Sequence, residues 1–154
     1  RCYDEMGVDV GAAVPLTPSQ VARGDCSPDA LQNTWGAQSA AMSCIAGGES
    51  GCRPSLPSGV DRTADGQSFS YGLYQVNMSV RPIQCSNFNG GASVNCKAAF
   101  VGTNYKATVQ DQALYDQCRT MLQDVQCNTE MAQKIYQQQG FGAWRNTATN
   151  CGLL

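Results

Sequence analysis

The sequence contains no histidine, and this absence excludes several mechanisms at once. Without imidazole there is no Ser-His-Asp or Cys-His nucleophilic catalysis, and no histidine-ligated metal site. Acid–base chemistry must therefore come from Asp, Glu, Lys, Tyr or Cys side chains. We expect no metal and no other cofactor.

Charged residues are scarce, at 14% of the 154 residues, and they are scattered along the chain. The formal charge is −2 and no basic stripe is present, so binding to nucleic acid through phosphate neutralisation is not expected. Long apolar runs are missing too, since none approaches the roughly 20 residues of a membrane span. The sequence therefore predicts neither a nucleic-acid partner nor a membrane partner.

Cysteine, in contrast, is abundant, with nine residues. There is no CxxC pair, and no histidine could complete a zinc site, so disulfides formed in an oxidising compartment are the simpler interpretation. Because nine is odd, at least one thiol is free or pairs with another chain, and the spacing does not give the connectivity. The first residues, Arg1-Cys2-Tyr3, are typical of a mature protein after removal of a signal or pro-segment. We expect a secreted protein that acts as a monomer.

The length and a hydrophobic content of 42% suit one domain with its own core. Residues 1–26 show no clear periodicity and predict an irregular N-terminal arm tied by Cys2 and Cys26. Residues 27–154 predict the main domain. Its helical patterns and capping signals indicate helices at about 28–35, 37–50, 111–126 and 128–139, the last capped by Asn128.

Between the second and third predicted helices the pattern changes. Asp65-Gly66 is a hairpin-turn signal between residues 60–64 and 67–71, which predicts a small β-ribbon. Residues 82–105 are expected to be mostly loop, pinned by Cys85 and Cys96. The predicted fold is therefore α+β and mostly helical, stapled by disulfides, with one small ribbon inserted after the second helix.

Glu49 is the first candidate for chemistry because it continues the apolar stripe of the second predicted helix. A carboxyl on the inward side of a helix end is partly desolvated, which raises its pKa as a general acid near neutral pH requires. The structural alternative is that Glu49 forms a salt bridge with an arginine such as Arg53 or Arg62.

Glycoside hydrolysis usually needs two carboxyl groups. The only acids on the ribbon after Glu49 are Asp61 and Asp65, and Asp65 is explained by its tight turn. Asp61 is therefore the better second candidate. The block that follows would supply hydrogen bonds and apolar faces to sugar rings, or else form a core turn, through Tyr71, Tyr74, Gln75 and Asn77.

The order of these motifs resembles the lysozyme superfamily. Glu49-Ser50-Gly51, followed about twenty residues later by the Tyr71–Asn77 block, is similar to soluble lytic transglycosylases and goose-type lysozymes. The contexts Cys-Ile-Ala-x-x-Glu-Ser and Tyr-Gly-x-x-Gln-x-Asn are also similar to c-type lysozymes. The tail, with 132–136, Gly140 and Trp144, is similar too, so the resemblance covers roughly residues 27–151.

The resemblance implies that Glu49 is the general acid/base that protonates the glycosidic oxygen. The implied substrate is peptidoglycan, cleaved at the β-1,4 bond between N-acetylmuramic acid and N-acetylglucosamine. The other matched positions are implied to border the reacting sugar (Tyr71 and Gly72), to form the cleft floor (Gln75 and Asn77) or to close the far side (Tyr136 and Trp144).

One position departs from the c-type pattern. Where those enzymes carry an aspartate before Tyr-Gly, this chain has Ser70, which cannot serve as the second carboxylate. Either Asp61 or Asp65 takes that role, or the single-glutamate pattern indicates a lytic transglycosylase with anhydro products. The slightly negative net charge of the chain would also suit a less anionic glycan such as chitin or chitosan. The further alternative is a non-catalytic descendant that binds glycans or a partner, which the loss of the aspartate at Ser70 would permit. Ser70 itself is expected among the substrate-binding residues.

Overall fold

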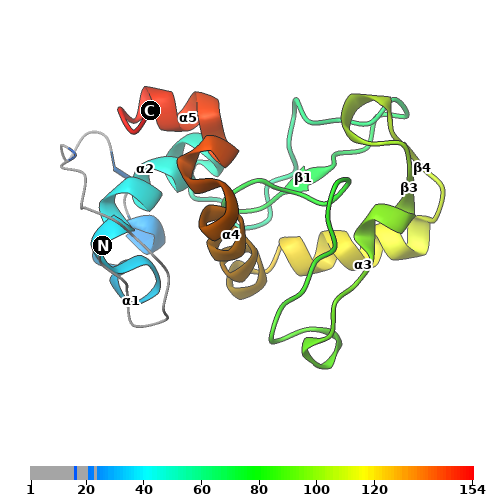
Figure 1. Cartoon of the computed structure of the whole chain (residues 1–154), viewed down its shortest axis with the longest axis horizontal. Helices are drawn as coiled ribbons and strands as arrows, with labels where there is room; N and C mark the ends of the chain where they lie inside the picture. Colours follow the sequence, from blue (N-terminus) through cyan, green and yellow to red (C-terminus); the bar gives the residue numbers. More distant parts are fainter. Residues whose placement is uncertain (1–15, 17–20, 23) are drawn as a thin grey trace. The chain divides into compact units, whose positions relative to one another are not determined.

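The computed structural model describes residue 16, residues 21–22 and residues 24–154 (Figure 1). Most of the expected N-terminal arm, including Cys2, lies outside the described residues. The chain forms two compact units. The first, unit 1, contains the described residues up to Cys52 together with Gln133–Leu154, and the second, unit 2, is Arg53–Ala132.

Unit 1 is helical, and its helix ends follow local sequence signals. The Ser27 hydroxyl accepts a hydrogen bond from the Ala30 amide at the expected helix start, although regular helix begins only at Gln32. Gly36 (φ +54°) and Gly51 (φ +61°) end the first two α-helices in conformations that favour glycine. The elements are η1 (Gly24–Cys26), α1 (Gln32–Trp35), η2 (Gly36–Gln38), α2 (Ser39–Ser50), the end of α4 (Val125–Gln139), η6 (Gly140–Trp144) and α5 (Arg145–Asn150).

The core of unit 1 packs around α2. Met42 and Ile45 on this helix are fully buried, as is Trp35 at the end of α1. The Cys44–Cys151 disulfide joins α2 to the residue after α5 across 107 positions of sequence, and the two helices are in contact (Figure 1). A second disulfide, Cys26–Cys52, ties η1 to the residues that follow α2. Cys26 therefore pairs inside unit 1, with a partner that the sequence did not indicate.

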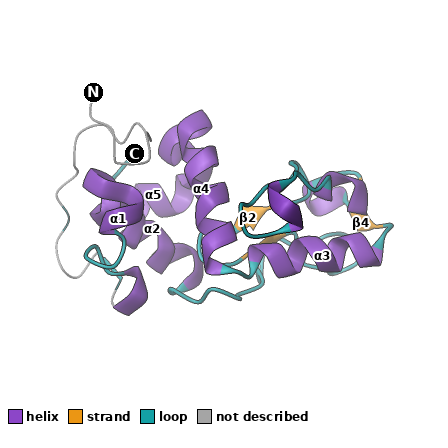
Figure 2. Ribbon diagram, turned by 90° about the horizontal axis from the view of Figure 1, so that it is seen from below, coloured by secondary structure: helices purple, strands orange, loops and turns teal. Residues whose placement is uncertain are grey.

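Unit 2 contains two small antiparallel sheets and the helix α3 (Gln112–Leu122) (Figure 2). In the first sheet, β1 (Ser70–Tyr71) pairs with β2 (Val76–Asn77), with Ser70 opposite Asn77. In the second, β3 (Phe100–Val101) pairs with β4 (Thr108–Val109). The remaining elements are the short 3-10 turns η3 (Asn89–Gly91), η4 (Cys96–Ala99) and η5 (Asn104–Lys106), and the start of α4.

The predicted ribbon is present only in part. The turn forms at Asp65-Gly66, where the Gly66 amide donates to the Thr63 carbonyl, but its flanks pair at a single bridge, Arg62 with Ser68. The regular pairing lies one turn later, between β1 and β2. The Ala64 amide bonds instead to the Ala107 carbonyl, so this loop shares its hydrogen bonds with a distant segment and does not extend its own hairpin.

The helix after this region begins as the sequence predicted. Asp111 caps α3, since its Oδ1 accepts from the Leu114 amide at 3.0 Å. The predicted end of this helix, at about residue 126, lies beyond its observed end at Leu122. Val125, which falls inside the predicted helix at 111–126, is 48% exposed and lies in the first turn of α4.

The start of α4 also differs from the prediction. Asp124 Oδ2 accepts from the Cys127 amide at 2.9 Å, so α4 begins at Val125 and Asn128 is not its cap. Asn128 is fully buried inside the helix. Its side chain is used in tertiary contacts, which a local capping signal does not reveal.

Two more disulfides hold unit 2. Cys85–Cys127 and Cys96–Cys118 attach the loop-rich segment 82–105 to α4 and α3, which confirms that this segment is pinned by its cysteines. Eight of the nine cysteines are thus paired in four disulfides among the described residues. The fold is α+β and disulfide-stapled, as predicted. Over the described ranges, no helix combines the length and apolar character that crossing a membrane requires.

Candidate active site

Glu49 is the penultimate residue of α2, and its side chain is partly buried. The Thr147 hydroxyl on α5 donates a short hydrogen bond to Glu49 Oε2 across 98 positions of sequence. Gly48 makes this approach possible, because a Cβ at position 48 would lie only 2.5 Å from Thr147 Cγ2. A glycine on α2 and the Cys44–Cys151 disulfide therefore bring α5 against the candidate acid.

Asp61 is fixed in unit 2 by its backbone and by its carboxylate. Its amide donates to the Ser58 hydroxyl at 2.8 Å, and its carbonyl accepts from the Phe69 amide at 2.9 Å. The carboxylate is partly buried and accepts two hydroxyl bonds, from Ser70 at 2.9 Å and from Tyr105 at 3.1 Å. The two hydroxyls thus donate to different oxygens of the same carboxylate.

Ser70 and Asp61 are direct neighbours, although nine positions separate them. Ser70 is fully buried on β1, and its hydroxyl is directed at Asp61 Oδ2. The position that lacks the aspartate of the c-type pattern is therefore in hydrogen-bond contact with an aspartate from the preceding loop.

Asp65, the competing acid, is part of its own turn. It accepts a short hydrogen bond from the Thr63 hydroxyl and a 3.1 Å bond from the Val109 amide. The Thr63 hydroxyl is the main cause that lowers the pKa of the Asp65 carboxyl. The Thr63 bond agrees with the expectation that the tight turn explains Asp65, whereas the Val109 bond links the turn to β4, 44 positions away.

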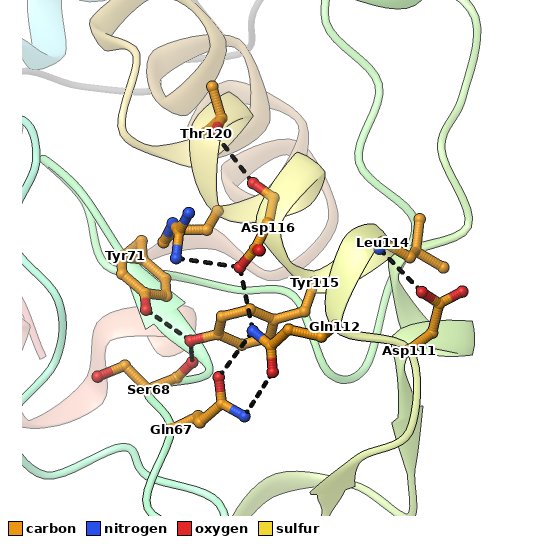
Figure 3. Close-up of polar contacts among 10 residues, drawn as sticks. Gln67, Ser68, Tyr71, Asp111, Gln112, Leu114, Tyr115, Asp116 and Thr120 are labelled. Carbon is orange, nitrogen blue, oxygen red and sulfur yellow. Dashed lines mark hydrogen bonds and ion pairs between the residues drawn. The ribbon is translucent and has the colours of Figure 1, made fainter.

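Tyr71 and Tyr74 lie in the core of unit 2, with 6% and 0% of their surfaces exposed. Their burial favours the alternative interpretation as a core turn, and their contact with a sugar stays a prediction. Tyr115 on α3 donates its hydroxyl to the Ser68 carbonyl at 2.7 Å, so the 2.5 Å contact between the two hydroxyls is donated by Tyr71 (Figure 3). Burial is the main cause that raises the pKa of Tyr115.

Gly72 begins the turn between β1 and β2 and lies against the α3–α4 junction. Its φ is +85°, and a Cβ there would collide with the Leu122 carbonyl oxygen and with Asn128 Nδ2. The Asn128 side chain accepts from the Tyr74 amide at 2.9 Å and donates to the carbonyls of Tyr71 and Leu122 at 2.8 Å. The conspicuous Tyr-Gly-Leu-Tyr sequence is therefore a buried turn that needs both the glycine and the asparagine.

Gln75 and Asn77 are partly buried, and their amides stabilise nearby turns. Gln75 Nε2 donates to the carbonyls of Leu56 and Gly72, at 2.9 and 3.0 Å. Asn77 Nδ2 donates to Asn104 Oδ1 at 2.8 Å. Their contact with a substrate stays a prediction.

Tyr136 and Trp144, the two tail positions, belong to unit 1. Trp144 is 5% exposed. Tyr136 is partly buried, and its ring lies edge-on to Trp35 at 5.9 Å and tilted against Phe141 at 5.1 Å. Tyr136 contributes to the aromatic packing of unit 1 and Trp144 is buried in that unit, and their predicted role toward a glycan stays a prediction.

Tyr105 was not predicted from the sequence as a site residue. This residue lies in η5, with 64% of its surface exposed, and donates its hydroxyl to Asp61 Oδ1. That bond and the Asp61 charge raise the pKa of Tyr105. The available signal was an aromatic residue between Asn104 and Lys106 in a polar loop, where no core position is expected.

Comparison of the chain with protein-family models, curated proteins and solved structures found no match. Any function assigned to the site therefore rests on the residues, on the motif resemblance and on the contacts described above.

Proposed function

We propose that the protein is a secreted, lysozyme-like glycosidase that cleaves the β-1,4 bonds between N-acetylmuramic acid and N-acetylglucosamine in peptidoglycan. Glu49 is its general acid/base. Support comes from the Glu-Ser-Gly and Tyr-Gly-x-x-Gln-x-Asn motifs. It also comes from the partial burial of Glu49 at a helix end, where a hydroxyl on α5 orients its carboxyl.

The single observation that carries the hydrolase proposal is the 2.9 Å contact between Ser70 Oγ and Asp61 Oδ2. The motif resemblance puts a second carboxylate at position 70, and Asp61 is an aspartate at bonding distance from that position. A second carboxylate can steady a cationic sugar or orient a water molecule, which hydrolysis requires and a single-glutamate transglycosylase does not.

In the proposed reaction, Glu49 gives its proton to the glycosidic oxygen as the bond to the anomeric carbon breaks. Water then supplies a hydroxyl to that carbon and returns a proton, so that one water is consumed for each bond cut. Asp61 contributes negative charge in this scheme, while Ser70 and Tyr105 supply hydroxyl donors that hold its carboxylate. No cofactor is required.

Secretion is part of the same proposal. Four disulfides among the described residues favour folding in an oxidising compartment. The proposed partner is the glycan itself, with chitin-like polymers as the alternative substrate because the chain is mildly acidic.

The test is a digest of purified peptidoglycan by the wild type and by Glu49→Gln, with the products read by mass spectrometry. Reducing ends that carry one added water, and that vanish in the variant, are the expected result. Anhydro ends lighter by one water would instead show that the protein is a lytic transglycosylase and not a hydrolase. The absence of products from the wild type, on peptidoglycan and on chitin oligomers, would refute glycan cleavage and leave at most a glycan-binding protein.

A further inference from the structure

Tyr105 is the one aromatic residue among the strongly exposed large apolar side chains of the described residues. An exposed tyrosine is ordinary when it is alone on a surface. Tyr105 is not alone, because its hydroxyl lies 3.1 Å from Asp61, the proposed second carboxylate.

The ring of Tyr105 is held in place at two points although most of it is exposed. One contact is the hydroxyl bond to Asp61 Oδ1. The other is an edge-to-face contact with Phe69, with ring centroids 5.5 Å apart and an interplanar angle of 83°. Phe69 is itself buried, with 2% of its surface exposed. A ring that is held before a ligand arrives loses little conformational freedom on binding.

The loop that presents Tyr105 is also fixed. The Asn104 amide donates to the Ser79 hydroxyl at 3.1 Å, and the Asn104 side chain accepts from Asn77 Nδ2. On the other side, the Ala107 carbonyl accepts from the Ala64 amide at 2.8 Å. The loop is therefore tied both to the end of β2 and to the loop that carries Asp61 and the Asp65 turn.

This combination of groups matches the chemistry of a pyranose ring. A sugar has an apolar face of C–H groups, which packs on an aromatic face, and a rim of hydroxyls, which need acceptors. Tyr105 offers an exposed ring, and the Asp61 carboxylate beside it has acceptor sites beyond those used by Ser70 and Tyr105.

We propose that Tyr105 is the stacking platform of a sugar-binding subsite on unit 2, beside Asp61, which takes one pyranose residue of the glycan chain. This inference rests on the proposed function for the identity of the ligand as a glycan. Tyr105 contributes affinity through its ring, and its hydroxyl has the separate task of holding Asp61.

Three substitutions test the ring of Tyr105, its hydroxyl and a control position on the surface of unit 2 separately. Tyr105→Ala removes both groups, Tyr105→Phe keeps the ring and removes only the bond to Asp61, and Val101→Ala truncates another exposed residue of unit 2 as the matched control. Each is made in a Glu49→Gln background, so that the ligand stays intact. Dissociation constants are measured by calorimetry for a hexamer of N-acetylglucosamine and for soluble, uncross-linked peptidoglycan strands.

We expect Tyr105→Ala to weaken binding of at least one glycan by about tenfold, as for a central aromatic contact. Tyr105→Phe should stay within about threefold of its parent, and Val101→Ala should be unchanged. An unchanged affinity in Tyr105→Ala, with the parent binding normally, would overturn the inference and leave the proposed function standing. A loss in Tyr105→Phe as large as in Tyr105→Ala would also overturn it. If the parent binds neither glycan and the wild type cleaves neither, the proposed function fails together with the inference.

Discussion

The buried hydroxyl of Ser70 donates a 2.9 Å hydrogen bond to Oδ2 of Asp61, so a serine on β1 and an aspartate from the preceding loop form one polar pair. Motif comparison treats position 70 as a lost aspartate. The contact shows that a carboxylate is nevertheless present next to that position. A residue that a motif lacks can thus have a spatial neighbour of the required chemistry.

The first prediction concerns this pair. We expect Asp61→Asn to lower the rate of peptidoglycan hydrolysis by about a hundredfold or more, because the amide cannot carry the negative charge. The double variant Asp61→Asn with Ser70→Asp moves the carboxyl to the neighbouring position and should recover part of the rate. Initial rates of soluble fragment release measure both, with melting temperatures to confirm folding. A full rate in Asp61→Asn would remove Asp61 from the reaction.

The second prediction concerns alkaline stability. The folded-state pKa of Tyr115 is raised above its unfolded value of about 10, so its contribution is fully present below that pH and is lost as the pH rises beyond it. We expect the wild-type free energy of unfolding to fall above about pH 10, and Tyr115→Phe to show a shallower fall from a lower starting point.

Denaturant unfolding at several pH values between 8 and about 11 checks this prediction. Tyr71→Phe is the matched control, because it leaves the bond from Tyr115 to the Ser68 carbonyl in place. Identical alkaline slopes in the wild type and in Tyr115→Phe would contradict the assignment of the slope to Tyr115.

The third prediction compares two glycines with nearly the same backbone angle. Gly72 (φ +85°) lies against the Leu122 carbonyl and Asn128, whereas nothing lies within 4 Å of a Cβ built on Gly66 (φ +84°). Gly66→Ala should cost only the backbone strain, about 1–2 kcal/mol. Gly72→Ala adds a collision with buried backbone and should destabilise by several kcal/mol or prevent folding. Equal melting temperatures in the two variants would contradict the tight packing at Gly72.

The fourth prediction concerns the hydroxyl that contacts the candidate acid. Thr147→Val removes the donor to Glu49 Oε2 while keeping the shape of the side chain. Hydroxyl donation favours the charged carboxylate, so its loss should move the alkaline limb of the kcat/KM profile to higher pH. Thr149→Val, which removes only a bond to the Arg145 carbonyl, is the control and should leave the profile unchanged. A profile that does not move in Thr147→Val would mean that Thr147 does not influence the acid.

Features set by local sequence could be predicted, and features set by distant contacts could not. Gly36, Gly51 and Asp111 mark helix ends through backbone conformation or capping, and the helix bounds predicted next to them agree with the structure. Asn128 has the same local signal for a cap, but its amide is used by the Tyr71–Tyr74 turn, more than fifty residues away. A capping rule based on neighbouring residues cannot reveal that a distant turn uses this side chain.

In the candidate site too, local features could be predicted and distant contacts could not. Glu49 and Asp61 could be selected as candidates from sequence, because Glu49 continues an apolar helical stripe and Asp61 is the acid on the following ribbon that no tight turn explains. Their partners could not, since Thr147 is 98 positions from Glu49 and Tyr105 is 44 positions from Asp61. The apolar positions of Tyr71 and Tyr74 were ambiguous in sequence, and only their burial identifies them as core.

The most direct test of the central claim compares two glutamates in one assay. Glu49→Gln and Glu130→Gln each neutralise one acid, and Glu130 serves as the control because it bonds to Ser86 at the surface of unit 2. With both variants shown to be folded by circular dichroism, the rate of soluble fragment release from peptidoglycan is measured beside the wild type. The account predicts that Glu49→Gln loses at least about a hundredfold in rate while Glu130→Gln retains it. A Glu49→Gln variant as active as Glu130→Gln would contradict the claim that Glu49 is the acid of a glycan-cleaving enzyme.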